Sequence, residues 1–350
     1  MDPRPGRLSV GVRIPPCRRA DEVAAEVARA EHYGFDVAWV ADSQLLWRDV
    51  FTVLGLAAVR TERIALATAV TNVATRHATV VASGVNTVAE LAPGRVLLGL
   101  GTGDSSVKPI GLPPTRRAEL REAITTIRTL LAGESREYGP RRVRLKDAAG
   151  TVPVHIAASG PKTLALAGET ADGVVTLAGI SPETVTGTRN AVREGMAAAG
   201  RVDDVELTVG AFCKVTDDVE RDAAVLKPIC LHMATIGGQD FLRIAGIELA
   251  PPPHVPEVYP DMVHAEDWDL AVRHAGRWVS DEMAVRFAET FCLFGTVDEI
   301  IARARRAVAL GATGFYLRHV GNYTLPSELV ETFGGDVLPK LRAAGGELDG

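Results

Sequence analysis

At 350 residues, 47% of them hydrophobic, the chain is long enough to bury a large core in one α/β barrel or in two ordinary domains. A net charge of −6 and a pI near 5.8 exclude a chain-wide basic field, so neither nucleic acid nor an anionic membrane is an expected partner. Residues 1–6 lack the apolar core of a secretion signal, and no apolar run approaches the length of a membrane span, which predicts a cytoplasmic protein. Reduced, buried thiols are expected at Cys17, Cys213, Cys230 and Cys292, which form no CxxC pair.

Short apolar runs of β character alternate with amphipathic helical stretches along the chain. A basic stretch at residues 141–146 is expected to form a solvated hairpin or loop. In chain order, strands are predicted at residues 8–14, 37–41, 64–70, 96–100, 154–157, 173–177, 207–213 and 314–317. Helices are predicted at residues 20–33, 49–60, 79–91, 116–131, 162–170, 182–198, 219–236 and 327–342.

This alternation favours parallel strands joined by right-handed crossovers. It fits a single (β/α)8 TIM barrel over residues 1–350, but an open doubly wound sheet alternates in the same way. One stretch, residues 237–279, breaks the pattern and holds five prolines in residues 251–260. We predict an insertion before the last strand. In a barrel it would cover the catalytic mouth as a lid; the alternatives are a surface excursion or an oligomer contact.

Two aspartates follow apolar strands. Asp42 comes directly after residues 37–41, and Asp104 occupies the corresponding place after residues 96–100. In a barrel the carboxyl ends of the strands meet at the active site, where two carboxylates could push their pKa values apart and give an acid and a base. Helix caps or ion pairs are the structural alternative. Trp47, just beyond Asp42, is expected either to wall the pocket or to fill the outer core.

A glycine-rich strand end, residues 99–106, could also hold a ligand. It lacks the third glycine of a dinucleotide fingerprint. Its glycines, including Gly103, still let the backbone approach a planar or anionic ligand, and Ser105 and Ser106 add hydroxyl donors.

A second such strand end is followed at once by a helix. The strand ends at Ser159 and Gly160, and Pro161 begins a helix whose free N–H groups suit a phosphate, with Ser159 and Lys162 in reach. A tight turn that binds nothing is the alternative. No metal site is expected, because the eight histidines do not pair at i, i+4.

Four stretches have a familiar pattern: residues 30–42 (AEHYGFDVAWVAD), 68–72 (TAVTN), 158–162 followed by 171–174 (ASGPK, ADGV), and 294–299 followed by 309–312 (FGTVDE, ALGA). In this order they resemble the bacterial luciferase-like superfamily. Within it they resemble the F420-dependent branch that contains methylenetetrahydromethanopterin reductase and F420-dependent glucose-6-phosphate dehydrogenase. The likeness runs from about residue 8 to residue 341.

The resemblance implies a barrel with an insertion near its C-terminal strands, with coenzyme F420 at its mouth. It implies a bulged third strand at Ala69 and Val70, often with a non-proline cis peptide, that backs the deazaflavin ring. Asp104 matches an acidic residue placed for proton transfer, and Trp47 matches an active-site tryptophan. Together with the strand ends above, the residues expected to contact the cofactor are Asp42, Ala69, Val70, Thr71, Asn72, Gly103, Ser105, Ser106, Ala158, Ser159, Gly160 and Lys162.

One position departs from the pattern. Many relatives have histidine directly after the aspartate of the second strand, and this chain has Ser43. A serine cannot accept a proton near neutral pH, so that role is vacant or falls to Asp104 or to the substrate. This departure argues against a sugar phosphate as the substrate.

The function predicted from the resemblance is that of an F420-dependent oxidoreductase, which transfers hydride between deazaflavin C5 and a small organic substrate. The alternative is an FMN-dependent two-component monooxygenase of the same fold, and a third possibility is a non-catalytic flavin-binding or sensory barrel. The expected partners are a small-molecule substrate, a second copy in a homodimer, and a flavin or F420 reductase that supplies reduced cofactor.

Overall fold

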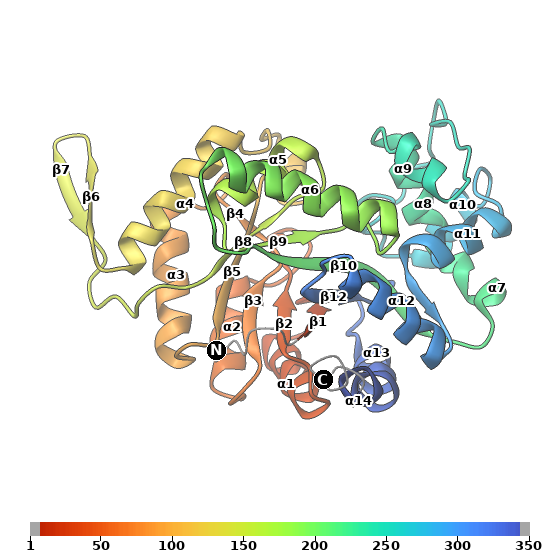
Figure 1. The fold of residues 1–350 in the computed structure, drawn as a ribbon, viewed down its shortest axis with the longest axis horizontal. Coiled ribbons are helices and arrows are strands. Elements are labelled where there is room, and N and C mark those ends of the chain that lie inside the picture. Colours follow the sequence, from red (N-terminus) through yellow and green to blue (C-terminus); the bar gives the residue numbers. More distant parts are fainter. Residues whose placement is uncertain (1–7, 344–350) are drawn as a thin grey trace.

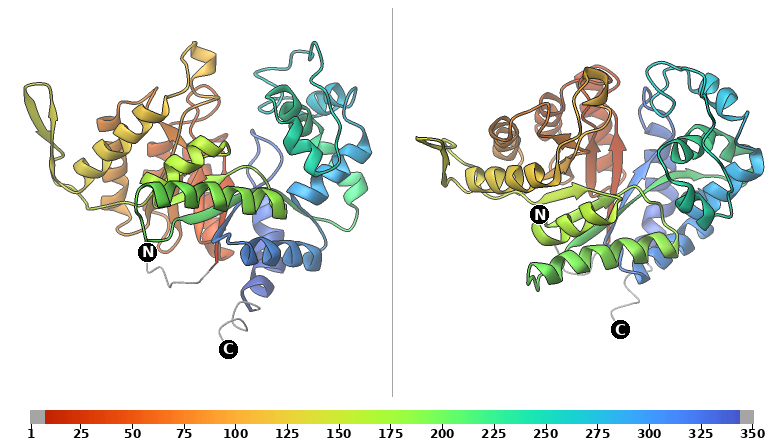
Figure 2. Two further views of the ribbon diagram at one scale, coloured as in Figure 1. Left: turned by 45° about the horizontal axis from the view of Figure 1, so that its top comes forward. Right: turned by 90° about the horizontal axis from the view of Figure 1, so that it is seen from above.

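The computed structural model describes residues 8–343, and within them eight parallel strands close into a barrel (Figures 1 and 2). The barrel strands are β1 (Ser9–Ile14), β2 (Val37–Val40), β3 (Ala65–Thr68), β5 (Val96–Gly101), β8 (Val154–Ala157), β9 (Gly173–Thr176), β10 (Glu206–Val215) and β12 (Gly314–Arg318). They follow one another round the barrel in this order, and β12 pairs back with β1. The (β/α)8 TIM barrel is confirmed.

Helices cover the outside of the barrel because each has one apolar face. In α12, for example, Thr296 and Glu299 form a capping box at the start, and Ile300, Ala304 and Ala307 are buried on one side. The outer helices are α1 (Ala20–His32), α2 (Val50–Ala58), α3 (Ala78–Leu91), α4 (Arg117–Leu131), α5 (Pro161–Thr170), α6 (Pro182–Ala198) and α12 (Val297–Ala309), with α13 (Ser327–Thr332), the π-helical turn η3 (Phe333–Val337) and α14 (Leu338–Ala343) at the C-terminal end.

Large side chains fill the barrel interior. Trp39 of β2 and Tyr316 of β12 pack edge to face, with ring centroids 5.7 Å apart, and Trp39 is 1% exposed. Between these two strands β1 has Gly11, where a Cβ atom would overlap the indole of Trp39. Since the interior is packed, a ligand has to bind at the strand ends.

The third strand is interrupted, although residues 64–70 were predicted as one run. It ends at Thr68, the Ala69–Val70 peptide is cis as the resemblance implied, and the short strand β4 (Thr71–Asn72) then pairs with β5. The Thr68 hydroxyl replaces ladder bonds here, donating to the carbonyl of Gly99 at 2.7 Å and accepting from its N–H at 2.9 Å. Gly99 has no Cβ, which would overlap the Thr68 carbonyl.

Between β10 and the short strand β11 (Leu293–Gly295), which pairs with the end of β10, lies a helical unit at one side of the barrel (Figure 1). A second apolar core, which includes Leu231, Phe287 and Phe291, holds it together. We call residues 219–291 the helical insertion. Its helices are α7 (Val219–Asp222), η2 (Ala223–Leu226), α8 (Lys227–Thr235), α9 (Gln239–Ile244), α10 (Trp268–Ala275) and α11 (Asp281–Phe291).

The assignment of residues 219–236 as the outer helix of the seventh barrel unit is therefore wrong. Pro228, which has no N–H, lies in the first turn of α8, so the helix restarts there. Leu231 of α8 packs in the second core, and α12 takes the place on the barrel. The helical unit extends beyond residues 237–279 on both sides.

The basic stretch forms an antiparallel hairpin of β6 (Ser135–Tyr138) and β7 (Arg141–Arg144) that projects from the body (Figure 1).

All four cysteines are buried and free, and burial raises the pKa of each thiol, as at Cys213 and Cys292. In residues 8–343 no helix is both long and apolar enough to cross a bilayer. Residues 1–6, where no secretion signal is expected, lie outside the described part.

The Thr68 hydroxyl gives a first prediction. Thr68→Val keeps the shape of the side chain but leaves the buried N–H and C=O of Gly99 without it, so the free energy of unfolding should fall by roughly 2–4 kcal/mol. Urea denaturation measures this. The matched control is Thr87→Val on exposed α3, where less than about 1 kcal/mol is expected. Equal losses in the two variants would contradict the assigned role.

Candidate active site at the carboxyl ends of the barrel strands

Side-chain hydrogen bonds join the loops that follow β2, β4 and β5. The hydroxyls of Ser43 and Ser105 lie 2.6 Å apart, and Gln44 Nε2 donates to the carbonyl of Ser106 at 2.7 Å. Asn72 Nδ2 donates to Ser106 Oγ at 3.0 Å. Three loops far apart in the sequence are thus tied together at one end of the barrel.

The residues around the cis peptide form a wall of this site. Asn72 is buried, and its Oδ1 accepts from the N–H groups of Ala74 and Thr75 at 3.1 and 2.9 Å, which fixes the loop after β4. Ala69 and Val70 are half-buried. Thr71 is fully buried, and its hydroxyl acts on the Asp42 carboxylate, where it opposes the rise in pKa that burial causes.

Asp42 lies beneath these loops with its carboxylate 1% exposed. Arg76, from the loop between β4 and α3, donates to Asp42 Oδ2 at 2.5 Å and to Asp49 Oδ2 at 2.8 Å. Burial raises the pKa of Asp42, and the positive charge of Arg76 opposes that rise. Asp42 is therefore a buried, ion-paired carboxylate.

Asp104 is in a different environment. Its carboxylate is 59% exposed and ion-pairs with Lys108, four residues on, at the start of η1 (Lys108–Ile110). Asp104 also acts electrostatically on His232 of the helical insertion, whose pKa burial lowers and Asp104 partly restores. Asp104 is not among the groups that shift the pKa of Asp42: Asp104 pairs with Lys108, and the acid that acts on Asp42 is Asp49.

Trp47 lies against Arg13 of β1 and the loop after β12. It is 8% exposed, and its indole N–H donates to the carbonyl of Asn322 at 2.9 Å. The guanidinium of Arg13 lies over its ring, and the ring of His264 meets it edge on at 6.0 Å. Trp47 thus joins the barrel to the helical insertion.

The expected phosphate seat lies at the start of α5. Ser159, Gly160 and Lys162 are exposed, Ala158 is buried, and α5 has no side-chain cap at its first turn. Because β8 pairs with β5 from Leu98 to Leu100, this end is next to the glycine-rich loop. Within residues 8–343 no hydrogen bond joins these four residues to the other predicted site residues.

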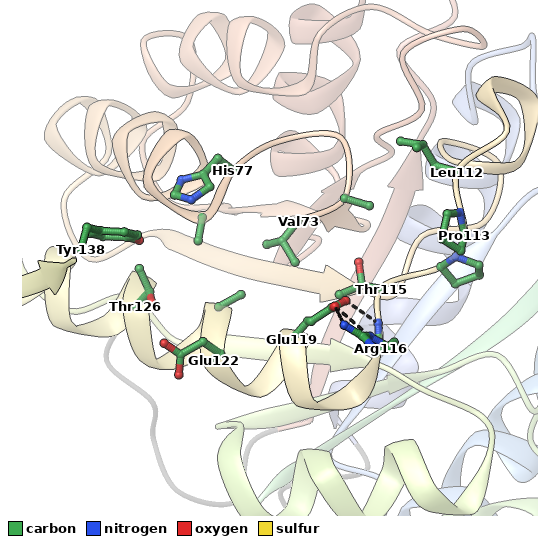
Figure 3. Close-up of a pocket in the computed structure, with 14 residues that line it drawn as sticks. Val73, His77, Leu112, Pro113, Thr115, Arg116, Glu119, Glu122, Thr126 and Tyr138 are labelled. Carbon is green, nitrogen blue, oxygen red and sulfur yellow. Dashed lines mark hydrogen bonds and ion pairs between the residues drawn. The ribbon is translucent and has the colours of Figure 1, made fainter.

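The structure also has a cavity of about 730 Å³, but it lies on the flank of the barrel between α3 and α4 (Figure 3). Val73, His77, Glu122 and Tyr138 are among its lining residues, and Arg116 pairs with Glu119 at its edge. None of the predicted site residues lines it. The strand ends therefore remain the candidate site.

Sequence reasoning missed several residues that hold this site together. Arg76 and Gln44 have no motif around them, and their partners are 34 and 62 residues away in the chain. Ser43 was noticed only as a missing histidine, yet its hydroxyl joins two loops. No group of three or more His, Cys, Asp or Glu side chains suited to a metal occurs in the described part of the chain.

The Asp42–Arg76 pair gives a second prediction. Arg76→Gln leaves a buried carboxylate without its cation and should cost about 3 kcal/mol. The pKa of Asp42 would rise further above the value near 3.9 of an unfolded aspartate, so the folded state binds the proton more tightly. Stability therefore falls as the pH rises through the folded-state pKa, and the loss should be larger at pH 8 than at pH 5.

Thermal unfolding at the two pH values measures this loss. The double variant Asp42→Asn, Arg76→Gln is the control, because without the carboxylate the added pH dependence should disappear. A loss that is equal at both pH values would show that the Asp42 charge is not its cause.

Comparison with known proteins agrees with the barrel fold. The sequence model of the luciferase-like monooxygenase family matches residues 5–314. A 5,10-methylenetetrahydromethanopterin reductase of Archaeoglobus fulgidus is 30% identical over 96% of this chain and 100% of its own length. An F420-dependent glucose-6-phosphate dehydrogenase of Nakamurella multipartita is 30% identical over 93% of this chain and 94% of its own. The solved structure of the coenzyme F420-dependent tetrahydromethanopterin reductase from Methanopyrus kandleri has a TM-score of 0.74 at 22% identity, and covers 96% of this chain and 99% of that one. The chain belongs to the luciferase-like monooxygenase family.

Proposed function

We propose that this protein is an F420-dependent oxidoreductase that transfers hydride between C5 of the deazaflavin and a small organic substrate. The observation that carries the proposal is the joining of three loops by Ser43, Asn72 and Ser106 at one mouth. Relatives with F420-dependent activities, aligned over nearly the whole chain, support the choice of coenzyme.

The wall formed by residues 69–72 fits a flat ring. Thr71 is buried beside the cis peptide and next to the Asp42 carboxylate, where its hydroxyl can also meet a ring heteroatom. Gly101, on the neighbouring strand, has no side chain, and a Cβ there would press on Val70. Thr71 and the backbone of Ala69, Val70 and Asn72 would hold the ring, with Asp42 beneath it.

The glycine-rich loop would hold the ring from the next strand. Gly103 has a φ of +86°, and a Cβ there would press on Val107, so this loop requires glycine. Ser105 is half-buried beside Ser43, where its hydroxyl can reach a ligand. Ser106 is buried and bonded to Asn72, so it shapes the loop.

The start of α5 would take the phosphate of the coenzyme. Its first N–H groups carry the positive end of the helix dipole, and no side chain caps them. Ala158, Ser159 and Gly160 present backbone there, and Lys162 adds a positive charge. Such an uncapped, exposed helix start suits an anionic tail.

Asp104 is the better candidate for exchanging a proton with the substrate. Its carboxylate reaches solvent, and Lys108 is an adjacent cation. Asp42 is buried and bonded to Arg76, so its role is to position the loops. Trp47 would border the substrate beside His264.

The helical insertion would cover the substrate side of the mouth. Asn322 Nδ2 donates to the carbonyl of Val263 at 2.6 Å, and His264 contacts Trp47, so two neighbouring residues of the insertion are fixed at the barrel loops. This contact supports the role of a lid that keeps water from the site.

A homodimer, a reductase that supplies reduced cofactor, and a cytoplasmic location belong to the same proposal. The exposed apolar side chains Val59, Val80 and Leu91 lie on or next to α2 and α3 and support a dimer contact there.

An FMN-dependent monooxygenase is the alternative, favoured by the family's description. The two can be separated on purified protein. We expect F420 to bind with a change in its fluorescence, and reduced FMN to cause no protein-dependent oxygen consumption. Oxygen consumption without F420 binding would establish the alternative, and binding of neither cofactor would overturn both.

A variant tests the phosphate seat in the same titration. Ser159→Asp places a negative charge at the start of α5 and should weaken F420 binding about tenfold. Ser83→Asp, on the exposed side of α3, is the matched control and should leave binding unchanged.

Asp104→Asn tests the proton exchange. With a compound that the protein turns over from a panel of carbonyls, imines and alkenes, kcat should fall by about 100-fold or more and one limb of its pH profile should vanish. Asp147→Asn, in the exposed loop after β7, is the control. An unchanged rate and pH profile would remove Asp104 from the mechanism.

A further inference from the structure

Two arginines lie next to each other inside the barrel, at the carboxyl ends of β1 and β12. The paired strands run in register from Ser9 and Gly314 to Val12 and Leu317, so Arg13 and Arg318 follow as the next pair. Arg13 is 4% exposed and Arg318 half-buried. Two like charges are thus brought together in a place that is largely shielded from water.

Both guanidiniums are held in place by neutral groups. Arg13 donates to Asn322 Oδ1 at 2.7 Å and lies over the Trp47 ring, 5.1 Å from its centroid. Arg318 lies 4.5 Å from the centroid of the Phe212 ring, and its buried Nε has no acceptor. Among residues 8–343, no aspartate or glutamate forms an ion pair with either arginine.

Three carboxylates elsewhere around the mouth already have partners. Asp42 is bonded to Arg76, Asp104 to Lys108, and Asp261 to the ring of His264 at 2.9 Å. None of these three pairs with either of the two arginines.

The neighbouring groups respond to this excess of positive charge. His319 follows Arg318 directly, and burial together with the charges of Arg13 and Arg318 lowers its pKa to about 3, so it is neutral. Burial lowers the pKa of Arg13 to about 10, which still leaves it charged at neutral pH. A pair of buried charges without a counterion is costly to maintain.

We propose that Arg13 and Arg318 bind an oxyanion group of the substrate, a carboxylate or a phosphate. This rests on the proposed function, because the loops assigned to the cofactor follow β2, β4, β5 and β8, whereas these arginines lie on β12 and β1, in the other half of the strand order. β12 pairs with β10, from which the helical insertion continues (Figure 1). The substrate is therefore an organic acid or a phosphorylated compound, held with its charged end against the two arginines.

The type of side chain fits this role. A guanidinium offers donors in a planar fork that matches the oxygens of a carboxylate or phosphate, and an aromatic face beneath it fixes its plane. Trp47 and Phe212 supply such faces for the two arginines. A lysine would keep the charge but lose the fork.

The test uses the F420-loaded protein and two probe anions, acetate observed by proton saturation transfer and inorganic phosphate observed by ³¹P line broadening. Wild type should bind at least one of them saturably. Arg318→Gln should weaken that binding roughly tenfold or more, and Arg318→Lys should weaken it less. Preference for acetate identifies an organic acid as the substrate, and preference for phosphate identifies a phosphorylated one.

Two further measurements separate the outcomes. F420 affinity, measured by fluorescence, should stay within about twofold of wild type in Arg318→Gln and in the control Arg142→Gln on the exposed hairpin. The Tm of ligand-free Arg318→Gln should be equal to or above that of wild type, because an uncompensated charge is removed.

The proposal is overturned if wild type binds neither anion, if Arg318→Gln binds the anion as wild type does, or if the variant loses F420 instead. A lowered Tm would assign Arg318 a structural role and would also overturn it. Wild type that binds an anion at these arginines but no F420 would instead reject the proposed function, so the two failures are distinguishable.

Discussion

The hydrogen bonds that Ser106 and Asn72 form across the barrel mouth are the constraint on which the candidate site depends. Trp39 and Tyr316 fill the interior, so the loops at the strand ends are the place left for a ligand. Ser106 accepts from Asn72 at its hydroxyl and from Gln44 at its carbonyl, which fixes three loops with one residue. Together with the pairing of β4 and β5, these bonds hold the flat wall at the cis peptide and the glycine-rich loop in their relative positions.

The positions of the strands could be predicted because short buried runs ending in polar residues are distinctive, and the places of Asp42, Asn72 and Asp104 followed from them. Closure of these strands into a barrel was implied by the resemblance. The break in the third strand was not visible in the periodicity, since Ala69 and Val70 continue the apolar run. The break was predicted from the resemblance to the luciferase-like superfamily. The bond that makes the break possible joins Thr68 to Gly99, 31 residues away, and no local pattern marks such a pair.

The helical insertion shows a second limit. An amphipathic helix has the same periodicity whether its apolar face packs on a sheet or on other helices, so the pattern of residues 219–236 predicts an outer barrel helix. The sequence signal for the start of a new helix, α8, within this stretch is Pro228 in its first turn. In the site, Arg76 was missed for a related reason. Arg76 forms ion pairs with both Asp42 and Asp49. These contacts depend on the tertiary structure, and neither composition nor residue spacing predicts them.

The distribution of charge then separates the two halves of the mouth. On the side of β2 and β5, Asp42 is paired with Arg76 and Asp104 with Lys108, so these two carboxylates already have cations. On the side of β1 and β12, Arg13 and Arg318 have none. If these arginines served only the fold, apolar residues of similar size would stabilise the barrel better, as buried ion pairs elsewhere demonstrate. Their presence beside two aromatic faces is explained when the ligand supplies the missing negative charge.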